Sequence, residues 1–124
     1  MSNPDQVLLA DDYPSHLETV AGIFKAFDFE VTAVSDGIIA VAMIETLERL
    51  RLVLTDFEMP GMNGVEVLRT IKKTGVLRAL MSARIGTDRT FDESLRQQCQ
   101  PDWLLAKPLT LSKMRELIAR LRPK

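Results

Sequence analysis

Polar side chains follow four short apolar runs of the sequence, and their types suit the binding of a divalent cation and an anionic group. These residues are Asp11 and Asp12 after Val7–Ala10, Asp56 after Leu52–Leu54, Ser82 after Ala79–Met81, and Lys107 after Leu104–Ala106. Three carboxylates brought close together would repel one another. A hard cation such as Mg²⁺ relieves that repulsion and prefers carboxylate and carbonyl oxygens. A hydroxyl group and a lysine ammonium beside it would stabilise a transferred phosphoryl group.

Each of these residues also has an ordinary structural explanation when it is taken alone. An acidic pair after a strand often caps a helix, and Asp56 alone would fit a turn before Pro60. Ser82 alone is more often a simple strand-end hydroxyl, and Lys107 alone is usually a surface charge. Their joint placement at four strand ends favours a common site, because chance rarely produces it.

The expected protein ligands of Mg²⁺ are Asp56, Asp12 and the main-chain carbonyl of Glu58. Asp11 is expected to act through a water molecule or by orienting its neighbour. This arrangement would make Asp56 a carboxylate nucleophile toward phosphorus, with Ser82 and Lys107 contacting the transferred group.

The elements that must position these residues alternate regularly along the chain. Five short apolar runs fit strands buried on both faces: Val7–Ala10, Val31–Val34, Leu52–Leu54, Ala79–Met81 and Leu104–Ala106. Stretches with helical period lie between and after them, namely Leu17–Phe24, Ala40–Leu47, Gly64 to near Gly75, Asp88–Gln98 and Met114–Leu121. The fourth of these helices has few apolar residues, so we expect it to be lightly held and mobile.

Five alternating strands and helices predict an α/β fold with right-handed crossovers. The expected architecture is a flavodoxin-like, doubly wound (βα)5 domain with a parallel sheet of strand order 2-1-3-4-5 and helices on both faces. In such sheets ligands bind outside the carboxyl ends of the strands, at the switch in strand order. The polar residues described above fall at that edge.

The composition is that of a soluble globular protein. The 124 residues are enough for one domain, predicted to span 1–124 without a further output domain. A net charge of −1 gives no attraction for nucleic acid or anionic lipid, and no run is long enough to span a membrane. The only cysteine, Cys99, cannot form an internal disulfide and fits a small core residue. We therefore expect a cytoplasmic protein.

Several separated motifs resemble the landmarks of response-regulator receiver domains in two-component signalling. Leu9-Ala10-Asp11-Asp12 is similar to the acidic opening of that family, and Asp56-Phe57-Glu58-Met59-Pro60-Gly61-Met62-Asn63-Gly64 closely resembles its phosphoacceptor segment, Asp-x-x-Met-Pro-x-Met-x-Gly. Ser82-Ala83 and Lys107-Pro108 are similar to its hydroxyl and small residue and to its lysine-proline pair. The resemblance covers essentially the whole chain.

The resemblance implies a role for each of these residues. Asp56 would be the phosphorylation site, and Asp11, Asp12 and Glu58, through its carbonyl, would complete the magnesium site. Ser82 would be the switch hydroxyl and Lys107 the lysine that senses the phosphoryl group. A cis Lys107–Pro108 peptide bond is also implied.

Three positions depart from the family pattern or modulate it. Leu104 stands where many receivers carry an aromatic residue, and Trp103 should face the other side of the strand, so we expect a switch carried mainly by Ser82 and the following loop. Glu58 and Arg84, beside the small residue Ala83, should flank the path of the attacking water, where their charges could pair. The alternative is that both are solvated surface charges, since exposed ion pairs contribute little energy.

The only histidine, His16, is predicted to be a solvated residue beside the partner-docking face rather than a phosphodonor.

The resemblance implies a signalling switch rather than an enzyme, one that promotes only its own phosphorylation and autodephosphorylation. A histidine kinase or a histidine phosphotransfer protein would donate to Asp56, docking near Tyr13, Pro14 and Leu17. Phosphorylation would shift the face formed by the fourth helix, the fifth strand and the fifth helix, toward an unknown output partner or a homodimer.

Two alternatives stay open. One is a binding module with the same fold that signals without phosphorylation, which Leu104 slightly favours. The other is a haloacid-dehalogenase-type phosphatase, although Glu58 stands where such enzymes usually carry a second aspartate. A flavin site is disfavoured, because the acidic loop after the first strand would repel a phosphate.

Overall fold

Five strands alternate with five helices in the computed structural model, which describes residues 4–122; residues 1–3 and 123–124 of the predicted domain lie outside this range. In chain order the elements are β1 (Gln6–Ala10), α1 (Pro14–Ala26), β2 (Glu30–Val34), α2 (Gly37–Ile44), β3 (Leu50–Asp56), α3 (Gly64–Arg69), β4 (Leu77–Ser82), α4 (Arg89–Cys99), β5 (Trp103–Ala106) and α5 (Leu111–Leu121).

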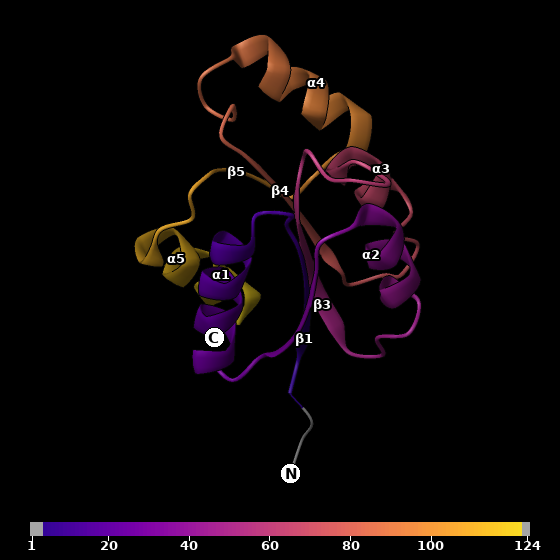
Figure 1. Cartoon of the computed structure of the whole chain (residues 1–124), viewed down its shortest axis with the longest axis vertical. Helices are drawn as coiled ribbons and strands as arrows, with labels where there is room; N and C mark the ends of the chain where they lie inside the picture. The colour runs from indigo at the N-terminus through magenta and orange to yellow at the C-terminus, as the bar shows by residue number, and fades with distance from the viewer. Residues whose placement is uncertain (1–3, 123–124) are drawn as a thin grey trace.

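All five strands are parallel, in the order β2-β1-β3-β4-β5. The predicted flavodoxin-like topology is therefore confirmed. The strand order reverses between β1 and β3, so their carboxyl ends flank the position where such sheets bind ligands. In Figure 1, α1 and α5 cover one face of the sheet and α2 and α3 the other, while α4 stands at the top.

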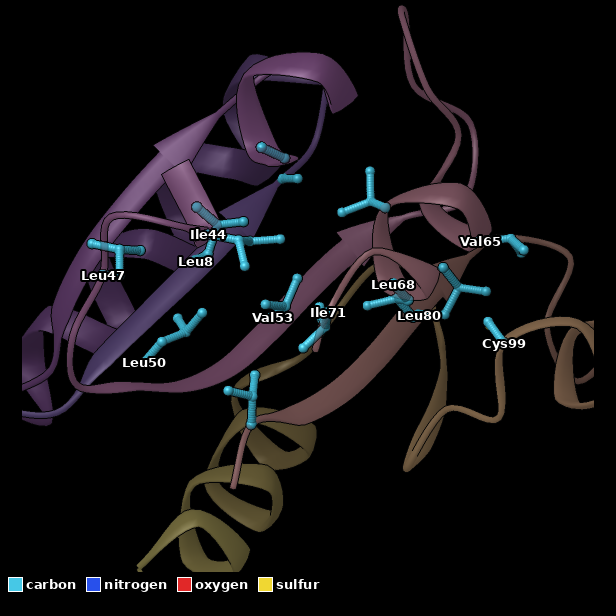
Figure 2. Close-up of a cluster of buried hydrophobic side chains, with 14 of the residues drawn as sticks. Leu8, Ile44, Leu47, Leu50, Val53, Val65, Leu68, Ile71, Leu80 and Cys99 are labelled. Atoms are coloured by element: carbon cyan, nitrogen blue, oxygen red, sulfur yellow. The ribbon is translucent and has the colours of Figure 1, made fainter. Parts of the chain in front are cut away.

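The central strands β1, β3 and β4 each carry an apolar run because their residues contribute to two cores, one on each face of the sheet. In β1, Val7 and Leu9 pack with α1 and α5, whereas Leu8 and Ala10 pack on the opposite face. Figure 2 shows the core on the face of Leu8 and Ala10, in which side chains of β1, α2, β3, α3 and β4 meet between the sheet and the helices. Alternate residues thus serve opposite faces, which explains the uninterrupted apolar runs.

The loop after β3 folds closely back onto the end of that strand. A side-chain carbon at Gly64 would collide with the main-chain oxygen of Asp56, and the Gly64 amide donates to the Phe57 carbonyl at 2.8 Å. Asn63 caps α3 by accepting from the Glu66 amide, while the Glu66 carboxylate accepts from the Asn63 amide, each at 2.9 Å. This capping box fixes the loop relative to Asp56.

Helix α3 ends earlier than the sequence predicts, at Arg69 rather than near Gly75. Thr70 is the C-cap residue, and both its amide and its hydroxyl donate to the Val67 carbonyl, which ends the helix at Arg69. Gly75 instead adopts a φ of 78° in the turn before β4. Ile71 is buried in the core although it lies outside the helix. Because it continues the apolar spacing of Val65 and Leu68, the sequence pattern placed the end of the helix too late.

Helix α4 has the light packing that its composition predicts. Of its eleven residues only Leu95 and Cys99 are buried, and Phe91 is half-buried. Cys99 is a core residue, as expected, and burial raises the pKa of its thiol despite the opposing charges of Arg78 and Arg69. Within residues 4–122, no helix combines the length and the hydrophobicity that a membrane span needs.

Candidate functional site

The structure gathers the predicted site residues at the carboxyl edge of the sheet. Asp11 follows β1 and is fully buried, Asp56 ends β3 and is 8% exposed, and Ser82 ends β4 and is 5% exposed. Lys107 follows β5. These residues come from four strand ends because the strands are parallel, so that every carboxyl end reaches the same edge.

Three carboxylates form a cluster at this edge. Asp11, Asp12 and Asp56 each present an oxygen, and these oxygens lie within 4.8 Å of one another. Asp12 is exposed, so the cluster opens toward solvent on its side. Clustered carboxylate oxygens beside an open face fit a hard divalent cation that keeps some of its waters. The opening is a pocket lined by Asp12, Tyr13, Asp56, Glu58, Ser82, Ala83, Arg84 and Lys107.

Lys107 joins two of the three carboxylates. Its ammonium nitrogen donates to Asp11 Oδ1 at 3.1 Å and to Asp56 Oδ2 at 3.0 Å. Its main-chain amide donates to the Ser82 carbonyl at 3.1 Å, which ties the residue to β4. The Lys107–Pro108 peptide bond is cis, as the family resemblance implied. The two hydrogen bonds of its ammonium group place the lysine charge inside the acidic cluster.

The pKa values of Asp11 and Asp56 are shifted in opposite directions. Burial alone would raise the pKa of Asp11, but hydrogen bonds from Tyr13, His16 and Lys107 outweigh it and lower that pKa. The pKa of Asp56 is raised, chiefly by burial and also by the charges of Asp11 and Asp12, against the opposing effect of Lys107. Burial tends to lower the pKa of Lys107, but its two carboxylate partners raise it. The lysine therefore stays charged at neutral pH.

His16 belongs to the site, and the expectation of a solvated histidine is wrong. Its side chain is 9% exposed, and Nδ1 lies 2.5 Å from Asp11 Oδ2 while Nε2 lies 3.1 Å from the amide nitrogen of Leu109. The sequence did carry a signal: His16 lies in the first turn of α1, and helical side chains lean toward the N-terminus, here toward the end of β1.

Arg84 does not form the possible ion pair with Glu58 across the opening. Within residues 4–122, its ion pair is with Asp88 at 3.7 Å, and its guanidinium carbon lies 3.9 Å from the centre of the Phe91 ring. The Arg84 amide donates to Ser82 Oγ at 3.1 Å. The attraction of the aromatic face and of Asp88 therefore turns the arginine toward α4.

An aromatic pair that the sequence analysis did not single out links the end of β3 to α4. The rings of Phe57 and Phe91 are 5.3 Å apart and nearly perpendicular, at 86°. Phe57 directly follows Asp56, and Phe91 lies in the first turn of α4 beneath Arg84. Contacts thus run from the residue after Asp56 to the helix that is most lightly packed.

Trp103 and Leu104 face opposite sides of the sheet, as predicted. Leu104 packs against the core shared with α2, α3 and α4, whereas Trp103 packs against the core shared with α1 and α5. Trp103 therefore does not replace the aromatic residue that many receivers carry at the position of Leu104.

Comparisons with known proteins agree with this geometry. A family model for the response regulator receiver domain matches residues 7–119. MtrA of Mycolicibacterium smegmatis, a DNA-binding response regulator, is 34% identical over 118 residues, which make up 94% of this chain and 49% of MtrA. The two-component response regulator ORR11 of Oryza sativa subsp. indica is 28% identical over 122 residues, or 97% of this chain and 82% of ORR11. The chain thus spans about half the length of MtrA.

A solved structure with the same fold is the receiver domain of the sensor histidine kinase PA1611 from Pseudomonas aeruginosa, which has a magnesium ion coordinated in its active site cleft. The two chains superimpose with a TM-score of 0.79 at 24% identity, covering 95% of this chain and 97% of the other. Because the family match reaches from β1 into α5, the chain belongs to the family of response regulator receiver domains.

Proposed function

We propose that this chain accepts a phosphoryl group on Asp56 from a phosphohistidine, in a reaction that depends on Mg²⁺. The observation that carries the proposal is the double hydrogen bond of Lys107 to Asp11 and Asp56 above a cluster of three carboxylates. Asp56 combines burial, a lysine partner and a place on the wall of the open pocket. The donor would be a histidine kinase or a histidine phosphotransfer protein.

The residues of this chain divide the work of transfer. A carboxylate oxygen of Asp56 attacks phosphorus, the bond from phosphorus to the donor imidazole breaks, and the departing ring nitrogen keeps the bonding electron pair. Lys107 supplies a fixed positive charge, and Ser82 a hydroxyl hydrogen bond, to the oxygens of the transferred group. Because Asp11 and Asp56 already hold the lysine, this charge needs no large movement to act.

The proposed ligands of Mg²⁺ are Asp12, Asp56 and the main-chain carbonyl of Glu58, with Asp11 acting through water or by orienting its neighbour. The oxygen donor set and the three-carboxylate cluster fit this ion. When bound, Mg²⁺ would neutralise the carboxylates and the incoming phosphoryl oxygens. The magnesium ion in the Pseudomonas aeruginosa receiver supports the same choice of cation here.

Phosphorylation is proposed to act on the surface of α4, β5 and α5. Ser82 would move toward the phosphoryl group and draw with it the loop that carries Arg84. Arg84 and Phe57 both contact Phe91, so a shift of either one would change the contacts that hold the first turn of α4. This path would serve in place of the missing aromatic residue at Leu104, and the displaced face would bind an output partner or a second copy of the chain.

A phosphorylation-independent binding module is the second candidate, and Leu104 at the usual aromatic position is the observation that favours it. Such a module has no use for a buried, lysine-paired aspartate. The opposed pKa shifts of Asp11 and Asp56 are a further argument for retained chemistry, since perturbed carboxylates gather at functional sites.

The deciding experiment measures intact mass after incubation with acetyl phosphate, with Mg²⁺ or with a chelator. The wild-type chain should gain one phosphoryl group only when Mg²⁺ is present, and Asp56→Asn should gain none. Asp28→Asn is the matched control, because Asp28 is exposed and asparagine tolerates its positive φ of 67°. A folded wild-type chain that binds Mg²⁺ but takes no phosphoryl group would favour the binding module.

A further inference from the structure

His16 occupies a bridging position that the proposed chemistry does not yet use. It lies in the first turn of α1, and its almost fully buried ring is placed between Asp11 and the main chain of Leu109. Leu109 is buried and follows Lys107 by two residues. The ring therefore joins the acidic residue after β1 to the segment that carries the lysine.

The directions of the two hydrogen bonds follow from the groups involved. A main-chain amide can only donate, so Nε2 of His16 accepts from Leu109. In the neutral ring the proton must then be on Nδ1, which donates to Asp11 Oδ2. The contact with Leu109 thus selects the tautomer that can hold the carboxylate.

Both oxygens of Asp11 are engaged by donors from separate parts of the chain. Oδ1 accepts from the Tyr13 amide at 3.0 Å and from the Lys107 ammonium at 3.1 Å, and Oδ2 accepts from His16. These contacts leave the fully buried carboxylate little rotational freedom. His16 and Lys107 are thus connected twice. Both donate to the Asp11 carboxylate, and His16 also accepts from the amide of Leu109, two residues after Lys107.

We propose that His16 is a positioning residue that sets the orientation of Asp11 and, through it, of Lys107 relative to Asp56. The proposal rests on the proposed phosphoacceptor function. An apolar side chain at this position would leave a buried carboxylate oxygen and the Leu109 amide without these partners, which is costly in a desolvated place. Partners that orient metal-site carboxylates affect cation affinity by about 10- to 100-fold.

Three substitutions separate the two hydrogen bonds of the ring. His16→Asn places an amide nitrogen near the position of Nδ1 and keeps a donor for Asp11. His16→Gln places an amide oxygen near the position of Nε2 and keeps an acceptor for Leu109 only. His16→Leu removes both. Glu18→Ala is the control, because Glu18 is an exposed residue of the same helix.

The first measurement is the ring-nitrogen NMR spectrum of the metal-free wild-type chain at neutral pH. We expect a protonated Nδ1 and an unprotonated Nε2, and the reverse pattern would overturn the proposal. This readout needs neither Mg²⁺ nor phosphorylation, so it stands even if the chain accepts no phosphoryl group.

The second measurement is Mg²⁺ affinity by calorimetry, followed by the rate of phosphorylation with acetyl phosphate. His16→Asn and Glu18→Ala should stay within about twofold of wild type, whereas His16→Gln and His16→Leu should lose about tenfold or more in Mg²⁺ affinity. If His16→Leu does not fold, the comparison of His16→Asn with His16→Gln decides. Equal affinities for these two variants would overturn the positioning role, whereas a wild-type chain that takes no phosphoryl group would overturn only the proposed function.

Discussion

The carboxyl group of Asp56 lies in an environment that favours reactivity at the expense of stability. Burial and the charges of Asp11 and Asp12 raise its pKa, and Lys107 only partly compensates. Asp11, at the same edge, has a lowered pKa because three donors surround it. Two aspartates about equally close to the lysine thus differ in their other neighbours, which suits one to chemistry and the other to support.

Asp56→Asn is expected to increase the free energy of unfolding at neutral pH when no divalent cation is present. The raised pKa means that the folded wild-type chain loses stability as the pH rises through the pKa of Asp56, and the neutral amide does not. The stability difference should therefore shrink as the pH falls. The lowered pKa of Asp11 means that both proteins lose stability on acidification. This contribution largely cancels in the difference between the two free energies of unfolding.

Urea unfolding of the two proteins across the acid-to-neutral range measures this difference. A variant that is less stable than wild type at neutral pH would show that the hydrogen bond of Lys107 to Asp56 outweighs burial and repulsion. Added Mg²⁺ should stabilise wild type more than Asp56→Asn, because the cation relieves the same repulsion.

Glu58 is the residue expected to affect the lifetime of the phosphoryl group. Its side chain is exposed at the opening of the pocket, where a carboxylate can hydrogen-bond and orient an attacking water. Glu58→Ala should therefore slow autodephosphorylation severalfold. Arg84→Ala is the comparison and should change the rate less, because Asp88 and Phe91 hold that guanidinium. Decay of the purified phosphoprotein measures both rates, and unchanged decay in Glu58→Ala would rule out this role.

At the scale of single elements, α4 is the part of the fold best suited to move. Two buried side chains attach it to the core, and the Phe57–Phe91 pair holds its first turn. Segments with few buried apolar contacts open at low free-energy cost. The helix therefore meets the site through a small number of contacts that phosphorylation can change.

Phe91→Ala should uncouple α4 from Asp56. Such an aromatic pair contributes about 0.5–1.5 kcal/mol beyond its buried area, and alanine removes that contact together with the surface on which Arg84 rests. Amide hydrogen exchange of residues 89–99, with and without phosphorylation, measures the coupling. We expect the wild-type response to be at least halved in Phe91→Ala, while Asp56 is still phosphorylated.

Phe91→Leu is the matched control for burial without a ring. A full response in Phe91→Ala would show that the signal reaches α4 by another route, such as the packing of Leu104. A reduced response in both variants would assign the coupling to the aromatic ring rather than to buried area.

At the scale of the whole molecule, ligand binding and stability are linked through the sheet. The acidic cluster joins the ends of β1 and β3, and Lys107 adds the end of β5. A cation that binds only the folded chain stabilises it by mass action, by about 2.7 kcal/mol at 100 times its dissociation constant. The carboxylates repel one another without the cation, whereas the bound cation relieves that repulsion and stabilises the folded chain.

The midpoint temperature of thermal unfolding should therefore rise by about 10 °C when the Mg²⁺ concentration is about 100 times its dissociation constant. Asp12→Asn should show a smaller shift, because it removes an exposed carboxylate of the cluster. Asp28→Asn, outside the cluster, should shift as wild type does. The absence of any shift in wild type at high Mg²⁺ concentration would argue against a cation site in this cluster.

The sequence by itself determined the order of strands and helices, the topology and the residues of the acidic pocket. Apolar runs and helical periods are local properties, and parallel strands bring their carboxyl ends to one edge whatever the details of packing. The sequence alone therefore predicts that the side chains at these strand ends lie together, namely Asp11, Asp12, Asp56, Ser82 and Lys107. The motifs around them also identified the family.

Only the tertiary structure decided the contacts that depend on the relative placement of distant segments. His16 and Leu109 are 93 positions apart, and nothing local indicates that a ring nitrogen will accept from that amide. The turn of Arg84 toward Phe91 and the early end of α3 likewise follow from packing. Such contacts are settled by differences of about 1 kcal/mol between competing partners, which residue type and spacing do not resolve.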